Sequence, residues 1–527
     1  MPAGCSRPSS RRLLSSSPWL ISSRSIVKRI MNAPAAPEVT RSPLSEARIA
    51  DDVFRQMRAA NLARWPSGAD VDFDRAVELH KSLPRHKQLG WVMRQAVAER
   101  RCLTQPRGGF GTFDMHRALM VTLDKEGLAD IVPTTTDSYT RNEHWELAQK
   151  GIEESERLGR SMLNGYPMVN YGVARARQLI EAIDKPAIML TGTTMPRLTS
   201  EIAFAGGYSS YLGSGIAYTT SYIKELSIED GIRNHQYLDR LAAMYHEHGV
   251  ELHRRQPGFL TGTNIPPSIA IVTCVLDCLL AAAQGVKNYG LEMGETLHLI
   301  QDAAAVAACG ELCQEYLAKK GFDDVFTPVT LLHWMSAWPQ DEAQAAAIIS
   351  YGGTLAAISG AASVTTKSTH EAFGIPTAQA NAEGLRMTRM AIYLARHIRL
   401  NGLPEYEKEK ALIEREVRAV VDKVLEMGDG DAAIGTVRAF EAGVMDIPWS
   451  PNRHCKSRVL PARDVDGYLR ILDPGLMPFP SEIMAVHEEG LRRRAEREKV
   501  AFGPDLAVQS VYEISEPLEK LLPAISR

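Results

Sequence analysis

The sequence has little of what marks secreted, membrane-spanning or nucleic-acid-binding proteins. Seven cysteines in 527 residues are too few for a secreted disulfide framework, so a reducing compartment is expected. The formal net charge of -3 comes from interspersed acids and bases and provides no basic stripe for nucleic acid. No run of 18 or more apolar residues occurs, and we expect no membrane-spanning segment. These absences favour a cytoplasmic protein whose partner is a small molecule.

The cysteines also give no clear metal site. Cys274 and Cys278 are four residues apart, as are Cys309 and Cys313, and each pair places two thiols on one face of a predicted helix. A metal is one interpretation. The other is a set of small apolar core residues, which we favour because no histidine or further cysteine follows at the spacing of a zinc site. We therefore assign no metal.

The first thirty residues differ from the rest of the chain. They contain nine serines, five arginines and one lysine but no acid, a composition typical of organelle transit peptides. The alternative is that translation starts at Met31 and that residues 1–30 are a disordered leader. In either case we expect residues 1–30 to be dispensable for the fold.

The rest of the chain is long enough for two domains, because single cores stop growing near roughly 250–300 residues. Between residues 100 and 370, short β-rich runs alternate with helical stretches, which predicts parallel βαβ units. Eight such units close into a (β/α)8 TIM-type barrel, and the pattern does not decide which candidate is surplus. The nine candidates are "CLTQPRGG", "DIVPTTTDS", "PMVNYG", "AIMLTGT", "GSGIAY", "GFLTGT", "VKNYGLE", "VFTPVTL" and "ASVTTK".

Long amphipathic helices replace this alternation beyond residue 400. "KEKALIEREVRAVVDKVLEMG" has apolar residues at helical spacing and ends in Gly428, and a Pro- and Gly-rich stretch that we expect to be irregular follows over about 443–480. We predict a barrel with N-terminal helices over 31–400 and a smaller helix-rich C-terminal domain over 401–527.

Polar side chains follow the predicted strands where each strand ends. "DIVPTTTDSYTRN" begins as a buried strand and continues with hydrogen-bonding residues up to Arg141, while Arg107 follows "TQP" and precedes two glycines. In a (β/α)8 barrel the active site lies at this end of the strands. Two arginines on adjacent strand tips predict a clamp for a carboxylate or phosphate; solvated surface arginines are the alternative.

Two further pairs are spaced four residues apart near predicted strand ends. Lys367 and Glu371 in "KSTHEAFGIP" lie where a strand gives way to a helix and form either a site pair or a simple ion pair. Tyr218 and Tyr222 in "GIAYTTSY" either donate phenolic hydrogen bonds into the barrel mouth or pack in the core.

Taken together, motifs from residue 100 to beyond 450 resemble the large, epsilon chain of methylaspartate mutase, also called glutamate mutase. They occur in order as "QPRGG", "PTTTDSYTRN", "GRSMLNGYPMVNYGV", "LTGTNIPPS", "GVKNYGLEMGE", "HWMSAWPQDEA", "KSTHEAFGIPT" and "GDAAIGTVRAFEAGVMDIPWSP". The resemblance implies a (β/α)8 barrel and an adenosylcobalamin-dependent isomerase that interconverts L-glutamate and threo-3-methyl-L-aspartate.

The resemblance also implies roles for single residues. Arg107 and Arg141 would belong to a three-arginine clamp on the substrate carboxylates, with Tyr218 and Tyr222 as further substrate contacts. Six residues would lie against the cobalamin and its adenosyl group: Gly109, Asn164, Trp338, Lys367, Glu371 and Ile375.

Two positions depart from the family pattern. Leu190, followed by Thr191, stands where the family has the third arginine of the clamp, and Leu212 stands where it has the glutamate that meets the substrate ammonium. One charge of each sign is lost, which leaves a more apolar pocket. A site without partners for those substrate charges would lose several kcal/mol of recognition. This predicts a substrate other than free glutamate, such as a modified, less charged acid; a non-catalytic metabolite-binding barrel is the second alternative.

The resemblance further implies a separate cobalamin-binding chain. The family's small chain ligates cobalt through an Asp-x-His-x-x-Gly motif, whereas the nearest stretch here, "DMHRAL" from Asp114 to Leu119, lacks the glycine. We expect a homodimer of this chain within a heterotetramer that contains the small chain.

Overall fold

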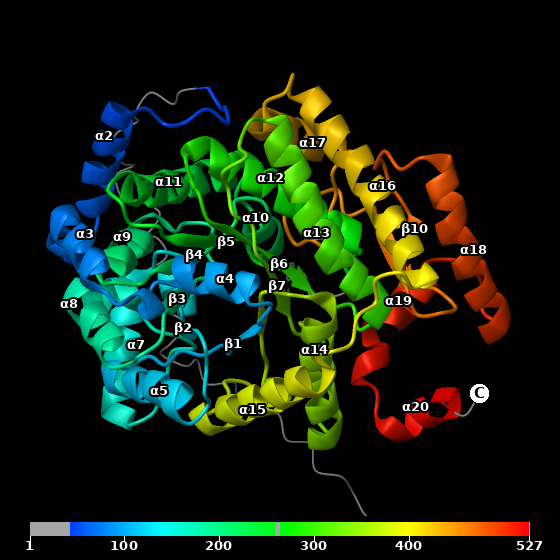
Figure 1. Ribbon diagram of the computed structural model, residues 1–527, viewed down its shortest axis with the longest axis horizontal. Coiled ribbons are helices and arrows are strands. Elements are labelled where there is room, and N and C mark those ends of the chain that lie inside the picture. Colours follow the sequence, from blue (N-terminus) through cyan, green and yellow to red (C-terminus); the bar gives the residue numbers. More distant parts are fainter. Residues whose placement is uncertain (1–42, 259–263, 526–527) are drawn as a thin grey trace, which may run out of the picture. The chain divides into compact units, whose positions relative to one another are not determined.

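A computed structural model describes residues 43–258 and 264–525, and residues Leu44–Arg527 form one compact unit. Its centre is a sheet of eight short parallel strands (Figure 1). The strands are β1 (Leu103–Gln105), β2 (Val132–Thr135), β3 (Ala187–Leu190), β4 (Ser210–Leu212), β5 (His253–Arg255), β6 (Tyr289–Gly294), β7 (Val329–Leu332) and β8 (Ser363–Thr365).

The strands follow one another around a barrel in chain order. The ladders run from β2 through β3 to β8 and then to β1, and every neighbouring pair is parallel. Backbone hydrogen bonds join β1 to the β2 segment, because Thr104 O accepts from Asp130 N at 3.0 Å and Gly108 O accepts from Thr135 N at 2.8 Å. The predicted (β/α)8 barrel is confirmed, and all eight C-terminal strand ends lie at one end of it.

Helices surround this barrel (Figure 1). Those that precede or connect the strands are α2 (Asp51–Leu62), α3 (Phe73–Ser82), α4 (Leu89–Ala98), α5 (Phe113–Lys125), α6 (Ser138–Arg141), α7 (Trp145–Leu158), α8 (Met168–Glu181), α9 (Arg197–Ala205), α10 (Ala217–Tyr222), α11 (Ile228–Glu247), α12 (Pro267–Gln284), α13 (Leu299–Lys319), α14 (Glu342–Ser359) and α15 (Ala378–Ala395). Short 3-10 turns occur at η1 (Pro66–Asp70), η2 (Arg85–Lys87) and η3 (Glu371–Phe373).

Six of the nine predicted strands are present as β1, β2, β3, β6, β7 and β8. Two predictions were wrong. "PMVNYG" begins helix α8, where Gly172 has φ 69° and interrupts the helix after its first turn, so its apolar run is a helix start. "GSGIAY" is the loop that leads into α10, and the strand lies just before it as β4. Most of "GFLTGT", residues 259–263, lies outside the described residues.

The C-terminal region packs on the outside of the barrel. It comprises α16 (Pro404–Met427), α17 (Ala432–Ala442), an antiparallel hairpin of β9 (Leu460–Arg463) and β10 (Leu469–Asp473), α18 (Ser481–Glu498), α19 (Pro504–Tyr512), η4 (Glu513–Ser515) and α20 (Leu518–Ile525). Helix α16 buries the predicted apolar face against α12 and α13. The stretch expected to be irregular contains the β9–β10 hairpin. A domain boundary at residue 400 remains a prediction.

Helix α12 lies in the middle of this packing. It is long and apolar enough for a membrane span by length and composition, but 94% of it is buried inside the fold. The barrel, α13 and α16 surround it, which explains why the helix is apolar on every side. Cys274, Cys278, Cys309 and Cys313 are buried free thiols of α12 and α13, as expected of core residues.

The predicted leader, residues 1–30, lies outside the described residues.

Candidate active site

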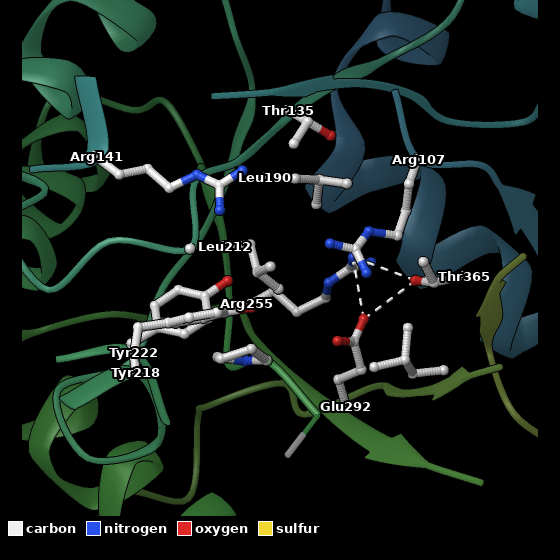
Figure 2. Close-up of a pocket in the computed structure, with 13 residues that line it drawn as sticks. Arg107, Thr135, Arg141, Leu190, Leu212, Tyr218, Tyr222, Arg255, Glu292 and Thr365 are labelled. Atoms are coloured by element: carbon white, nitrogen blue, oxygen red, sulfur yellow. Dashed lines mark hydrogen bonds and ion pairs between the residues drawn. The ribbon is translucent and has the colours of Figure 1, made fainter. Parts of the chain in front are cut away.

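A cavity opens at the C-terminal ends of the strands and contains, with its mouth, about 400 Å³ of empty space. Figure 2 shows the side chains that surround it. They come from strands and loops all around the barrel: Arg107, Thr135, Arg141, Leu190, Gly192, Leu212, Tyr218, Tyr222, Arg255, Pro257, Glu292, Leu332 and Thr365. Both predicted clamp arginines, both tyrosines and both departing leucines therefore share one cavity.

Arg107 reaches the cavity from the loop after β1. Its Nη1 donates to the Met335 sulfur at 3.2 Å, and no ion pair within the described part of the chain neutralises it. The loop passes very close to its neighbours: a Cβ at Gly109 would lie 2.4 Å from Thr135 O and 2.9 Å from Gly165 Cα. Glycine at 109 is therefore needed for this backbone approach, which places Arg107 at the cavity wall.

Arg141 lies at the end of α6, the short helix after β2. Asp137 caps this helix by accepting hydrogen bonds from the backbone N–H groups of Tyr139 and Thr140. Arg141 Nε donates to Thr136 O at 2.7 Å, which aims the guanidinium inward, and no described carboxylate forms an ion pair with it. Burial lowers the pKa of Arg141, and the positive charge of Arg107 lowers it further. An anion between these two cations would relieve that cost.

The loop after β3 makes room for Arg141. Gly192 has φ 58°, and a Cβ there would approach Arg141 Nη1 to 3.3 Å. Thr193 Oγ1 donates to the Arg141 backbone carbonyl at 2.6 Å. The polar residues that follow the strands thus hold the clamp arginine in position.

Tyr218 and Tyr222 are adjacent on α10, with ring centroids 5.3 Å apart. Tyr218 is buried, and burial raises the pKa of its phenol well above the usual value, so its hydroxyl stays protonated. Tyr222 is 41% exposed. Both line the cavity, so a purely core role is excluded for Tyr222.

Leu190 and Leu212 are the last residues of β3 and β4 and are paired across the two strands. They are 5% and 6% exposed. Thr191, next to Leu190, donates its hydroxyl to Leu212 O at 2.9 Å and so joins the two strand ends. The leucine side chains form an apolar wall beside the clamp.

Two charged residues of the cavity were missed in the sequence. Arg255 from β5 and Glu292 from β6 form a buried ion pair at 3.2 Å. Arg255 also donates to Gln105 Oε1 at 3.0 Å, and Glu292 accepts from Gly258 N at 2.8 Å and from Thr365 Oγ1 at 3.1 Å. Glu292, the acid at the end of the predicted strand "VKNYGLE", was an available signal, because a buried strand rarely carries an unpaired charge.

Lys367 and Glu371 follow β8 and form an ion pair at 2.5 Å. Lys367 is buried and Glu371 is partly buried. Burial lowers the pKa of Lys367 to about 8, although Glu371 opposes this shift. His370, which lies between them in the chain, lines a different pocket together with Phe373. A surface ion pair is excluded, because the ammonium is buried.

The other predicted cofactor residues lie on loops of adjacent strands. Trp338 follows β7 and donates its Nε1 to Trp334 O at 3.0 Å. Ile375 follows β8 and is 49% exposed. Asn164 lies near β2, where its side-chain oxygen accepts from Ser138 N at 2.9 Å, and its neighbour Gly165 contacts Gly109. Because β7, β8, β1 and β2 are neighbours in the barrel, the six residues follow four adjacent strands.

A metal site would need a cluster of ligating side chains. No group of three or more His, Cys, Asp or Glu side chains in residues 43–258 and 264–525 has the arrangement of a metal site. His116 of "DMHRAL" is buried, bonds to Thr134 Oγ1 at 2.9 Å and stacks on Tyr166. This histidine is a core residue.

The fold and the site define a (β/α)8-barrel protein with a cationic cavity at the end of the barrel where such folds carry out chemistry. The chain belongs to the methylaspartate mutase E chain family: residues 83–519 match the family described as Methylaspartate mutase E chain (MutE).

Relatives named glutamate mutase epsilon subunit match nearly the whole of their own length. That of Desulfitobacterium hafniense is 43% identical over 88% of this chain and 96% of the relative. That of Treponema denticola is 42% identical over 89% and 96%, and that of Halobacterium salinarum is 42% identical over 90% and 98%. The resemblance in the sequence motifs is thereby confirmed.

Proposed function

We propose that this chain is the barrel subunit of an adenosylcobalamin-dependent carbon-skeleton mutase, an isomerase that rearranges a small carboxylic acid in the cytoplasm. The observation that carries the proposal is the cavity with two guanidinium groups, Arg107 and Arg141, that no described carboxylate neutralises. Charge-assisted, bidentate hydrogen bonds from such groups select carboxylates. Family membership supports the reaction class.

The residues at the mouth fit adenosylcobalamin. Lys367 and Glu371 offer a donor and an acceptor for ribose hydroxyls, and Trp338 and Ile375 offer apolar surface for a macrocycle. When bound, the cofactor supplies an organic radical by homolysis of its Co–C bond. The chain's own contribution is to orient the acid with Arg107 and Arg141 and to exclude water from the narrow cavity.

The cobalt ligand would come from a separate small cobalamin-binding chain, because His116 is a core residue. Exposed apolar side chains lie on the segments that follow β2, β4 and β8 and would be covered by that chain and the cofactor: Tyr139, Met162, Tyr222, Phe373 and Ile375. We propose two copies of each chain, with this chain as the central homodimer of a heterotetramer.

The test mixes the full chain with the small cobalamin-binding chain, adenosylcobalamin and a candidate acid. A catalyst gives a substrate-dependent paramagnetic signal by electron paramagnetic resonance, whereas a metabolite-binding barrel binds the acid without one. Lys367→Ala should reduce turnover at least tenfold and leave the circular dichroism spectrum unchanged. Lys408→Ala, at an exposed lysine of α16, is the matched control. Unchanged turnover in Lys367→Ala would remove Lys367 from the cofactor site.

A further inference from the structure

The charges that line the cavity do not sum to zero. Four lining side chains carry charge: Arg107, Arg141, Arg255 and Glu292. Arg255 and Glu292 pair at 3.2 Å and cancel each other. Arg107 and Arg141 remain, each without an ion-pair partner among the described residues. The cavity therefore has an excess of two positive charges.

Its single carboxylate is already occupied. One Glu292 oxygen accepts from the backbone N–H of Gly258 at 2.8 Å, and the other accepts from Thr365 and pairs with Arg255. An ammonium group in the cavity would compete with Arg255 for these oxygens. Among the described lining residues, no other acid is present to receive it.

The remaining wall offers no substitute. Leu190, Leu212 and Leu332 are buried side chains around the cavity, and Leu190 and Leu212 stand next to each other between the two clamp arginines and the tyrosines (Figure 2). Tyr218 and Tyr222 can accept a hydrogen bond but carry no negative charge. An ammonium group buried here would lose its hydration beside the leucines and would be repelled by the two guanidinium groups. Both effects are unfavourable.

We infer that the substrate is a dicarboxylic acid without a free ammonium group. Its two carboxylates bind Arg107 and Arg141, its charge of minus two balances the excess of the cavity, and its carbon chain lies on the leucine wall. The inference rests on the proposed function and narrows its substrate. An unsubstituted dicarboxylate and an N-acylated acidic amino acid share this chemistry, and binding measurements separate them.

The first experiment measures binding to the full chain by calorimetry. Glutarate, N-acetyl-L-glutamate and L-glutamate have the same two carboxylates and differ at one carbon: hydrogen, acetamido or ammonium. At least one of the first two should bind tenfold or more tightly than L-glutamate. If glutarate binds and N-acetyl-L-glutamate does not, the cavity excludes acylated substrates. L-Glutamate binding as tightly as the other two, or no binding by any of the three, would overturn the inference.

Variants at the leucine wall test whether the missing acid is the reason why the cavity disfavours an ammonium group. Leu212→Glu should move the preference toward L-glutamate by at least tenfold, because it supplies an acid for the ammonium. Leu212→Gln is the matched control with the same shape and no charge, and it should not move the preference. Leu190→Arg with Leu212→Glu should favour L-glutamate more than either single change, because each single change buries an unpaired charge. If these variants fail to fold, the order of affinities of the wild type for the three acids still tests the inferred substrate class.

The complete system separates this inference from the proposed function. With the small cobalamin-binding chain and adenosylcobalamin present, a paramagnetic signal with L-glutamate alone would overturn the substrate class and keep the mutase. Tight binding of glutarate or N-acetyl-L-glutamate without a signal for any acid would keep the substrate class and overturn the mutase.

Discussion

Lys367 carries its proton over a narrower pH range than an exposed lysine. Burial lowers its pKa from 10.5 to about 8, and the ion pair with Glu371 is intact below that pH. Because the folded pKa lies below the unfolded pKa, the unfolded chain binds more protons between pH 8 and 10.5. The contribution of Lys367 to the free energy of unfolding therefore rises over this interval.

Urea unfolding at pH 7 and pH 9.5 tests this shift. The wild type should gain stability relative to Lys367→Met as the pH rises, since tyrosines and cysteines titrate in both proteins and cancel in the difference. Turnover should fall above pH 8 in the wild type, because the ammonium that would face the cofactor is lost. A stability difference that is the same at both pH values would show that Lys367 has an ordinary pKa.

Gly109 tests the backbone approach that positions Arg107. Gly109→Ala would place its Cβ 2.4 Å from Thr135 O, and neither backbone can move freely within the barrel. We expect a loss of about 1–3 kcal/mol in the free energy of unfolding and a weaker affinity for carboxylates. Gly503→Ala is the control, because a Cβ at Gly503 meets nothing within 4 Å. Equal stability of the two variants would contradict the predicted clash.

These residues also show what a sequence can reveal about a site. Arg107 and Arg141 could be predicted because each follows a predicted strand, and the structure places both at the cavity. Arg255 could not, because two adjacent arginines in "HRRQPG" resemble a surface turn. Only the fold shows that Arg255 faces Glu292 inside the barrel. The roles of the site residues stay predictions until binding is measured.

Strand β5 is a buried strand made of His253, Arg254 and Arg255. Arg254 pairs with Asp239 of α11 at 2.8 Å, and both are fully enclosed. Removing one partner of a buried pair leaves an uncompensated charge, so Arg254→Met should cost about 3–5 kcal/mol of stability. Arg254→Met with Asp239→Leu should recover most of the loss. A double-mutant cycle from urea unfolding measures the coupling, and additive losses would contradict it.

The strands explain which elements could be predicted. Apolar, β-branched runs such as those of β3 and β7 showed in the sequence and are strands. β4 reads Ser-Tyr-Leu and β5 reads His-Arg-Arg, and neither was among the predicted strands. Parallel pairing with both neighbours, together with ion pairs to Asp239 and Glu292, stabilises β5 as a strand. Because these partners are distant in the sequence, β5 could not be predicted from its own residues and their immediate neighbours.

At the scale of the whole molecule, the C-terminal region covers two outer helices of the barrel, α12 and α13. Helix α16 places Val417, Val420, Val421 and Val424 against α12 and α13, and all four are fully buried. Polar contacts accompany them: Tyr316 donates to Asp422 at 2.7 Å, and Gln301 donates to Glu409 at 2.6 Å. Exposing four such valines costs roughly 6–12 kcal/mol, which is about the whole net stability of a domain.

Because this cost is about as large as the net stability of a domain, we predict that residues 31–400 do not fold alone. This holds although the sequence pattern favours 401–527 as a separate domain. The fragment 31–400 should aggregate or unfold on size-exclusion chromatography, because α12 loses its cover and its apolar surface becomes exposed. The full chain should unfold in urea in one transition that includes the barrel and the C-terminal region. A chain that ends at residue 516 is the control, since it lacks α20 but keeps α16 to α19, and it should remain soluble. A monomeric 31–400 fragment with its own cooperative transition would show instead that the barrel is an independent domain, to which the C-terminal region adds only a cover.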